Sequence, residues 1–251
     1  AARVVFQTAL TLGEGRDGAA ALALAKILRS HLSDTWVRAA VLTSSRNHAA
    51  QVLTELLAGD KAGLGNTEAR ETIAALAEII ARDGTEAQIR QLLDQLAPIE
   101  PIEQWQSAFL GALYQSPRGA AVLRRVASGL EKSKWATWIG MIHVNSRAVA
   151  LDRKSAVAAR IEAVEALATT LVNDDQATET LLTALEPLDL QLAVVRTLRR
   201  NLSNSEGQAE RALIRGWSSA SPTSRSEILA ALLSNSSSSL VLLDAVKSKA
   251  L

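Results

Sequence analysis

The 251-residue chain contains no cysteine. Disulfides, thiolate metal sites, cysteine nucleophiles and covalent haem attachment are therefore excluded for these residues. Aromatic residues make up only 3% of the chain, with a single Tyr, and Pro and Gly number 5 and 13. So few helix breakers, in a chain that is 48% hydrophobic and rich in Ala and Leu, favour an all-helical protein.

Neither sign of charge dominates the chain. The 27 Lys and Arg residues oppose 26 Asp and Glu residues, which gives a formal net charge of +1 at pH 7. A globally basic or acidic protein is excluded, although a local patch is not. No apolar run approaches the roughly 18 residues of a membrane span, so we expect no membrane insertion. Because Ala1 stands in mid-pattern, we expect a segment of a longer polypeptide.

A ten-residue pattern, V-R-x-x-A-A-x-A-L-G, recurs along the chain in weak variants. Its first, fifth, sixth and ninth positions lie close together on one helical face. The intervals between starts are mostly 31 to 36 residues, and the wider gap after residue 105 has room for an extra unit near Trp135. Such spacing is typical of helical-repeat proteins. The matches lie at 4–13, 37–46, 69–78, 105–114, 159–168, 190–199 and 224–233.

Apolar segments between these matches are predicted to be the first helices of antiparallel hairpins, with the matches as second helices. Gly or Pro stands in the breaks, as at Gly59-Asp60 and Ser116-Pro117, because Gly tolerates the left-handed conformation after a helix and Pro cannot continue one. The first helices are expected at 18–30, 48–57, 85–96, 118–130, 176–185 and 208–217.

A single hairpin cannot bury its apolar face, whereas stacked hairpins can. The sequence therefore predicts an all-α, right-handed superhelix of about seven or eight hairpins, of the HEAT or armadillo kind. Residues 1–251 would form one elongated repeat domain. Within it, residues 1–16 would be the second helix of a truncated first repeat, and residues 235–251 a capping helix or a cut repeat.

Two segments carry a resemblance to a known family. VVFQTALTLGE at Val4–Glu14 and TWVRAAVLTSS at Thr35–Ser45 resemble the HEAT-repeat region of large, planctomycete-type bacterial multidomain proteins. In that family a β-propeller of the dehydrogenase type precedes the repeats, and a haem-binding cytochrome c domain with a Cys-x-x-Cys-His motif follows them. The resemblance implies an exported or periplasmic protein in which this segment has a structural or docking role. The family's catalytic and haem-binding motifs lie outside the repeats and do not carry over to this chain.

Residues for catalysis or metal binding do not gather in the sequence. None of His31, His48 and His143 is followed by Glu, the pairing used by iron-binding HEAT-repeat hydroxylases, and none lies in an array of three or four ligands. Serines are plentiful, but no G-x-S-x-G elbow occurs, and the turn at 63–66 follows no predicted strand. We therefore predict no catalytic residue, no metal and no cofactor.

One segment departs from the balanced charge. Residues 116–160 hold nine basic residues against two acidic ones, so the segment carries +7 and the rest of the chain −6. Basic residues interleaved with aromatics can hold phosphate while stacking a base. The candidate patch for an anionic ligand or a partner comprises Arg124, Arg125, Lys132, Lys134, Trp135, Trp138, Arg147, Arg153 and Lys154.

The same residues also have a structural interpretation. Trp135 and Trp138 are spaced i, i+3 and would pack between repeats, which would leave the basic residues on a solvated ridge. Trp36, Trp105 and Trp217 lie in or beside repeat helices and are likewise predicted to be core residues. The Arg at the second pattern position is predicted to pair with an acidic residue of a neighbouring hairpin, at Arg38, Arg70, Arg160 and Arg225.

Three functions follow from these features. The first is a non-catalytic scaffold whose concave face, lined by second helices, docks a protein partner or flanking domains of the same polypeptide. The second is a nucleic-acid binder of the HEAT-like DNA glycosylase type, with salt-sensitive binding at the basic patch. The third is a small lyase-type HEAT-like enzyme, for which a pocket tyrosine is expected and only Tyr114 is present. We favour the scaffold.

Overall fold

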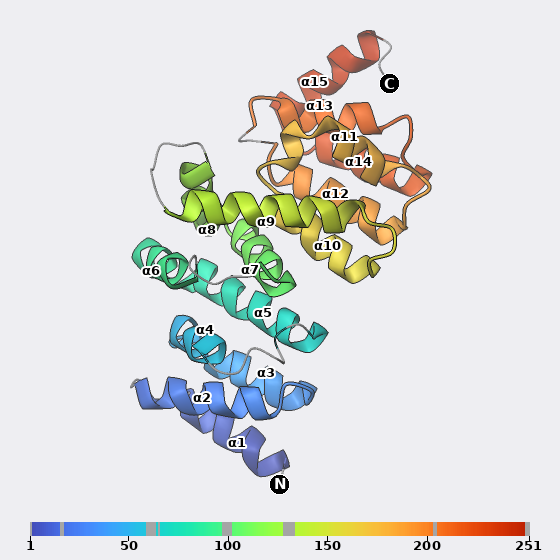
Figure 1. Cartoon of the computed structure of the whole chain (residues 1–251). Helices are drawn as coiled ribbons and strands as arrows, with labels where there is room; N and C mark the ends of the chain where they lie inside the picture. The colour runs from blue at the N-terminus through green and yellow to red at the C-terminus, as the bar shows by residue number, and fades with distance from the viewer. Residues whose placement is uncertain are drawn as a thin grey trace. The chain divides into compact units, whose positions relative to one another are not determined.

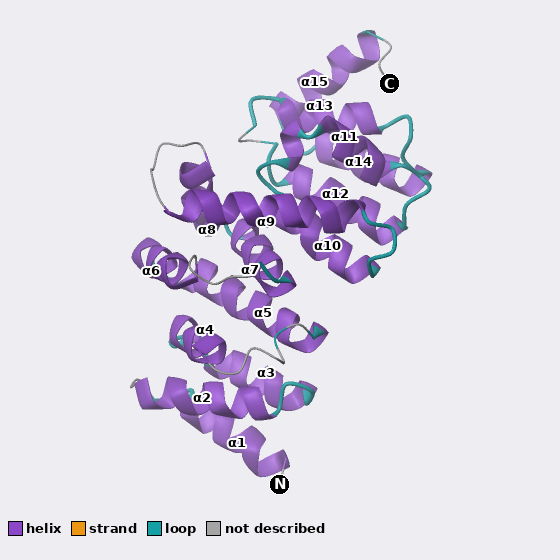
Figure 2. Ribbon diagram, viewed as in Figure 1, coloured by secondary structure: helices purple, strands orange, loops and turns teal. Residues whose placement is uncertain are grey.

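The structure, a computed structural model, describes residues 2–15, 18–58, 64, 66–96, 102–127, 134–202 and 205–248. These residues form fifteen α-helices and one short 3-10 helix, with no strand among them (Figures 1 and 2). The prediction of an all-α protein is confirmed. By their internal contacts the residues divide into two compact units, Ala1–Ile139 and Gly140–Leu251. One elongated domain over 1–251 stays a prediction.

Helices of the first unit stack in two series. In one series α1 contacts α3, α3 contacts α5 and α5 contacts α7, and in the other α2 contacts α4, α4 contacts α6 and α6 contacts α8. The first series coincides with the pattern matches and the second with the predicted first helices. The bounds are α1 (Ala2–Leu12), α2 (Gly18–Ser30), α3 (Thr35–Ser44), α4 (Ala49–Ala58), α5 (Thr67–Asp83), α6 (Glu86–Leu96), α7 (Gln104–Gln115), α8 (Pro117–Ala127) and the start of α9 (Lys134–Leu151).

The second unit repeats this arrangement. Helix α12 contacts both α10 and α14, and α13 contacts both α11 and α15, around a core of Ala, Val and Leu side chains. The helix expected near the chain terminus is present as α15. After the end of α9, the elements are α10 (Val157–Ala166), the 3-10 helix η2 (Leu171–Asn173), α11 (Asp175–Leu182), α12 (Leu188–Arg199), α13 (Gln208–Gly216), α14 (Pro222–Leu232) and α15 (Ser236–Lys247).

Local sequence explains where the helices begin. The carboxylate of Asp34 accepts hydrogen bonds from the backbone N–H groups of Trp36, at 3.0 Å, and Val37, at 3.1 Å, and so caps α3. The amide oxygen of Asn66 caps α5 in the same way, 2.7 Å from the N–H of Ala69. These caps satisfy donors that have no partner inside the helix.

Tryptophan burial follows the helical phase. Trp105, Trp135 and Trp138 are buried, as predicted, and Trp217 packs partly buried against the core of the second unit. The prediction for Trp36 is wrong, because its side chain is 76% exposed. The buried face of α3 consists of Val37, Ala40, Val41 and Ser44. Trp36, which precedes Val37, points away from that face.

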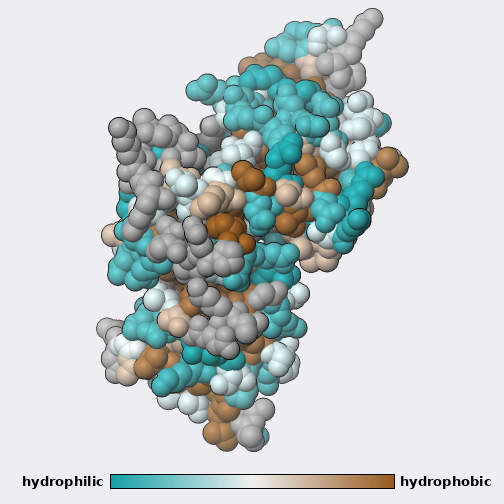
Figure 3. Space-filling model, viewed as in Figure 1, coloured by the Kyte–Doolittle hydropathy of each residue, from teal (hydrophilic) through white to brown (hydrophobic). Residues whose placement is uncertain are grey.

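Exposed large apolar side chains are scattered over the surface except on α15, where Leu240, Leu243 and Val246 follow one another along the helix. On the face drawn in Figure 3, hydrophilic residues are interspersed with apolar ones. Among the helices that the structure describes, none is both long enough and apolar enough to cross a membrane.

Candidate functional site

The basic patch predicted from sequence is divided between the two units. Of its lysines, Lys132 lies outside the described residues, and only the backbone of Lys134, the first residue of α9, is described. The members in the first unit are Arg124, Arg125, Trp135 and Trp138. Those in the second unit are Arg147, Arg153 and Lys154.

The two tryptophans of the patch belong to the core of the first unit. Trp135 and Trp138 are 5% and 1% exposed. The indole N–H of Trp135 donates to the carboxylate of Asp94 at 2.9 Å, and the guanidinium of Arg90 lies 5.6 Å from the centre of its ring. The structural interpretation of these residues is therefore confirmed, and neither ring is available to stack on a base.

An acidic residue of another helix neutralises Arg125, one of the two patch arginines in the first unit. Glu86 of α6 accepts from Arg125 of α8 at 2.6 Å and from Arg90 at 3.0 Å. These hydrogen bonds hold the pKa of Glu86 below its ordinary value, and the bond from Arg125 has the larger effect. Arg90 and Arg125 thus share Glu86, and Asp94 accepts from Trp135. Arg124 is half-buried on α8.

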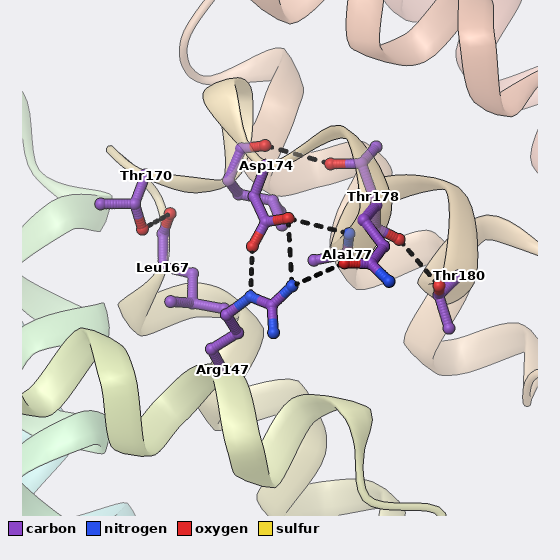
Figure 4. Close-up of polar contacts among 9 residues, drawn as sticks. Arg147, Leu167, Thr170, Asp174, Ala177, Thr178 and Thr180 are labelled. Atoms are coloured by element: carbon purple, nitrogen blue, oxygen red, sulfur yellow. Dashed lines mark hydrogen bonds and ion pairs between the residues drawn. The ribbon is translucent and has the colours of Figure 1, made fainter.

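Arginines of the second unit are paired in the same way. Figure 4 shows the guanidinium of Arg147 pointing at the carboxylate of Asp174, 2.5 Å away, which also caps α11 by accepting from the N–H of Ala177 at 3.0 Å. The hydrogen bond from Arg147 is the main cause of a lowered pKa at Asp174. Arg153 donates to Glu186 at 2.7 Å, and Lys154 is exposed in the turn after α9.

The arginines at the second pattern position have a role that the sequence pattern does not reveal. Pairing with the next hairpin is confirmed for Arg38, 3.7 Å from Glu71, and for Arg160, 2.7 Å from Glu186. In addition, each donates to a carbonyl near the end of the preceding helix, Arg38 to Leu32 at 2.6 Å and Arg160 to Ala150 at 2.8 Å. Carbonyls at a helix end lack partners within the helix, so these cations cap it.

The other two pattern arginines keep only part of this scheme. Arg225 donates to the carbonyls of Trp217, at 2.9 Å, and Ser218, at 2.6 Å, after α13. Arg70 is buried, and its guanidinium lies 3.4 Å from the hydroxyl of Thr67. Each of the four pattern arginines therefore contacts another residue of the protein.

A groove of about 1000 Å³ lies in the first unit between α4 and α6 and ends at the C-terminus of α5. We call it the α4–α6 groove. Its lining is mainly polar and holds three arginines, five Gln or Asn residues and a single carboxylate. The lining residues are Arg46, Asn47, His48, Ala49, Ala50, Gln51, Thr54, Ile79, Ile80, Arg82, Asp83, Gly84, Gln88, Gln91, Leu92, Gln95 and Arg118.

Three arginines line one end of this groove, and two of them pair with Asp83. Arg46, from the turn after α3, lies 3.4 Å from the carboxylate, and Arg82, from the last turn of α5, lies 3.2 Å from it. Arg118, in the first turn of α8, donates to the carbonyls of Arg82 and Gly84. Hydrogen bonding by Arg82 is the main cause of a lowered pKa at Asp83. Asp83 lines the groove here, and Glu78 lines the neighbouring cavity together with Arg82 and Arg118, so three arginines face two carboxylates and this end of the groove is basic.

The turn before α8 fixes the position of Arg118. The hydroxyl of Ser116 donates to the carbonyl of Ala81 in α5 at 2.8 Å, and Pro117 begins the helix with its preset φ angle. Arg118 is therefore held at the end of α5, where the helix dipole favours a cation.

Amide side chains line the rest of the groove. Gln88, Gln91 and Gln95 stand at i, i+3 and i+7 on α6, which places them on one face. Opposite them on α4 lie Gln51 and Thr54, and the hydroxyl of Thr54 donates to the side-chain oxygen of Gln95 at 2.9 Å. This spacing of glutamines is the one feature of the groove that is readable in the sequence.

The groove lining holds one His and one Asp, His48 and Asp83. Among the residues that the structure describes, no three His, Asp or Glu side chains gather to hold a metal ion. The ring nitrogen Nε2 of His48 lies 2.8 Å from the carbonyl oxygen of Gly15. Burial lowers the pKa of His143 to about 4, and a hydrogen bond with the backbone of Ala166 partly opposes this shift. Tyr114 is buried.

Comparison of the chain with models of known families, with curated proteins and with solved structures gave no match.

Proposed function

We propose that the chain is a non-catalytic, HEAT-like binding module that docks an extended protein segment. The observation that supports this function is the α4–α6 groove, whose size suits a short peptide and whose lining combines amides with cations. Helical-repeat proteins commonly present such elongated surfaces to partners. The groove lies among first helices, whereas the sequence pattern favoured the layer of second helices.

The finer fold also belongs to this proposal. The spacing of 31 to 36 residues and the two series of stacked helices in each unit support a right-handed superhelix of about seven or eight hairpins that runs through both units. A compact globule of this length has a radius of gyration of about 18 Å. Small-angle scattering of the whole chain should give a clearly larger value, and a value near 18 Å would contradict the superhelix.

The resemblance to planctomycete-type multidomain proteins gives this proposal a setting. The docked segment would then belong to a flanking domain of the same polypeptide or to another exported protein. The rival function in nucleic-acid binding has less support, because Trp135 and Trp138 are buried and Arg125, Arg147 and Arg153 are paired with carboxylates.

A selection of random dodecapeptides against the purified chain tests the proposed function. Selected peptides should bind with micromolar affinity and should lose most of it when Gln91 is changed to Ala together with Arg46→Gln. The matched control is Arg3→Gln, since Arg3 is exposed on α1, outside the groove. Selected peptides that bind the groove variant and the parent chain equally would refute the use of this groove.

A parallel titration with DNA and RNA at low and moderate salt tests the rival function. Phosphate contacts release counterions, so true nucleic-acid binding weakens steeply as salt rises. Salt-sensitive binding, in the absence of any peptide selected at the groove, would replace our proposal with the rival. We expect no binding at moderate salt.

A further inference from the structure

The arginine end of the α4–α6 groove has more hydrogen-bond donors than the protein itself uses. Each guanidinium offers five N–H donors, and the two oxygens of a carboxylate accept about four hydrogen bonds. Arg46 and Arg82 share Asp83, while their side chains remain 74% and 67% exposed. Arg118 is directed to helix-end carbonyls. Donors of Arg46 and Arg82 therefore remain available to a second, external carboxylate.

The amide row on α6 matches a peptide backbone better than a phosphate backbone. A Gln side chain carries both a donor and an acceptor, as a peptide group does, whereas phosphate oxygens only accept. The side-chain oxygens of Gln88 and Gln95 accept from Thr85 and Thr54, so these two residues offer their NH2 donors and Gln91 offers both kinds of group. The lining of the groove includes no Phe, Tyr or Trp ring, and the imidazole of His48 is buried with its Nε2 atom 2.8 Å from the carbonyl oxygen of Gly15, so no exposed ring is offered for a base to stack on. These two features favour a peptide over a single-stranded nucleic acid.

The length of the amide row on α6 determines how many peptide residues can lie along it. Gln88 and Gln95 are seven residues apart, about 10 Å along a helix, which equals about three residues of an extended chain. Gln88 lies near the arginine end and Gln95 at the opposite end, where Thr54 bonds to it. A second cavity of about 490 Å³ shares Arg82 and Arg118 with the groove, so the surface continues past the arginines.

From these observations we infer that the α4–α6 groove binds an extended acidic peptide. Its backbone lies along the amides of α6 over about three residues, and one or two adjacent Asp or Glu side chains are bound by Arg46 and Arg82. The inference rests on the proposed function and names its partner class. Asp83 competes with the ligand for the same guanidiniums, so it sets the affinity for acidic peptides.

A positional-scanning hexapeptide library tests this inference although the sequence of the natural ligand is not defined. Each pool fixes one residue type at one position, and binding to the whole chain is read by fluorescence anisotropy at low salt. We expect pools with Asp or Glu at one or two neighbouring positions to bind about tenfold more tightly than the matching Asn and Gln pools. Raising the salt concentration should reduce this preference.

Four variants then assign the preference to named residues. Arg46→Gln should weaken the acidic pools about tenfold and leave neutral pools unchanged. Asp83→Asn should tighten the acidic pools, because it frees two guanidiniums, and a purely structural role of Arg46 and Arg82 predicts no such gain. Gln91→Ala should weaken acidic and neutral pools alike, by about threefold to fivefold. The control Arg3→Gln should change neither.

The possible failures point to different errors. If neutral or basic pools bind best and still need Gln91, the acidic ligand is wrong while the proposed peptide docking stands. If no pool depends on Gln91 or Arg46, both the inference and the use of this groove fail. If a single-stranded oligothymidylate of eight nucleotides displaces the best acidic pool and loses affinity on Gln91→Ala, the occupant is a nucleic acid and the inference is overturned.

Discussion

The ion pair between Arg160 and Glu186 offers a sharp test of how the second unit is stabilised. The two side chains are 3% and 2% exposed, and their charged atoms are 2.7 Å apart. Glu186 also accepts from Arg153 at 2.7 Å, but the side chain of Arg153 is 60% exposed. One buried carboxylate thus has a buried and an exposed partner, which separates the effect of burial from the effect of charge.

We expect Glu186→Gln to cost about 3 kcal/mol of unfolding free energy. Breaking a buried ion pair typically costs about 3–5 kcal/mol, because the remaining charge stays in the core without compensation. The lower end applies here, since Arg160 keeps its bond to the carbonyl of Ala150 at 2.8 Å. If the chain melts cooperatively, this loss corresponds to a decrease in Tm of about 6–12 °C.

The matched control is Arg153→Gln, which removes the exposed cationic partner of the same carboxylate. An exposed partner is worth less than about 1 kcal/mol, so this variant should melt within a few degrees of the parent. Urea denaturation followed by circular dichroism at 222 nm measures both variants, with an unchanged m-value as the check that the folded states are comparable.

A double substitution completes the test. Arg160→Met with Glu186→Leu replaces the pair by apolar groups and should be less destabilised than the sum of the two single changes, with a coupling of about 1–3 kcal/mol. Equal losses for Arg153→Gln and Arg160→Met, or additive single changes, would refute the reasoning that burial decides the strength of this pair.

Three further predictions follow from the same structure. Burial lowers the pKa of His143 from 6.5 to about 4, so the unfolded chain takes up this proton at a higher pH than the folded chain does. Up to about 3 kcal/mol of unfolding free energy should therefore be lost as the pH falls from 6.5 to 4. Urea denaturation at several pH values should show that His143→Gln removes most of this loss. A methyl group on Gly216 would lie 2.3 Å from Cδ1 of Leu182, whereas one on Gly140 would meet nothing within 4 Å. Gly216→Ala should therefore destabilise the protein by about 1–3 kcal/mol, and Gly140→Ala should stabilise it by about 0.5–1 kcal/mol. The opposite order of stability in thermal melts would contradict the packing. Trp36 is exposed and Trp138 is buried, so Trp36→Ala should change stability by less than about 0.5 kcal/mol and Trp138→Ala should cost about 3–5 kcal/mol in the same assay.

Helix positions could be predicted from the sequence because each depends on residues close together in the chain. The face of α3 formed by Val37, Ala40 and Val41 is a local pattern, and so is the cap at Asp34. The prediction for Trp36 is wrong because it equates membership of a repeat helix with burial and ignores the residue's phase relative to that face. A turn of about 100° per residue separates neighbouring positions, and that is enough to move a side chain from core to surface.

The basic patch could not be judged from the sequence, because the acids that offset it lie in other helices. Glu86, Asp174 and Glu186 lie outside residues 116–160 and meet the arginines only in the fold. A charge summed along a segment measures proximity in sequence, whereas neutralisation depends on distances of a few ångströms. The groove is hidden in the sequence for the converse reason, since its arginines at 46, 82 and 118 are far apart in the chain.

Sorting the arginines by what they contact therefore changes which surface is the candidate. Arg38, Arg160 and Arg225 donate to carbonyls near helix ends, and Arg125 and Arg147 each meet a carboxylate of another helix. At the end of α5, by contrast, three guanidiniums gather beside two carboxylates, Asp83 and Glu78, and the side chains of Arg46 and Arg82 stay largely exposed. Local charge is unbalanced there, beside a row of amides that can bind a backbone. An anionic partner would restore the balance without displacing any arginine from a helix end, so we place recognition in the α4–α6 groove rather than in the basic segment.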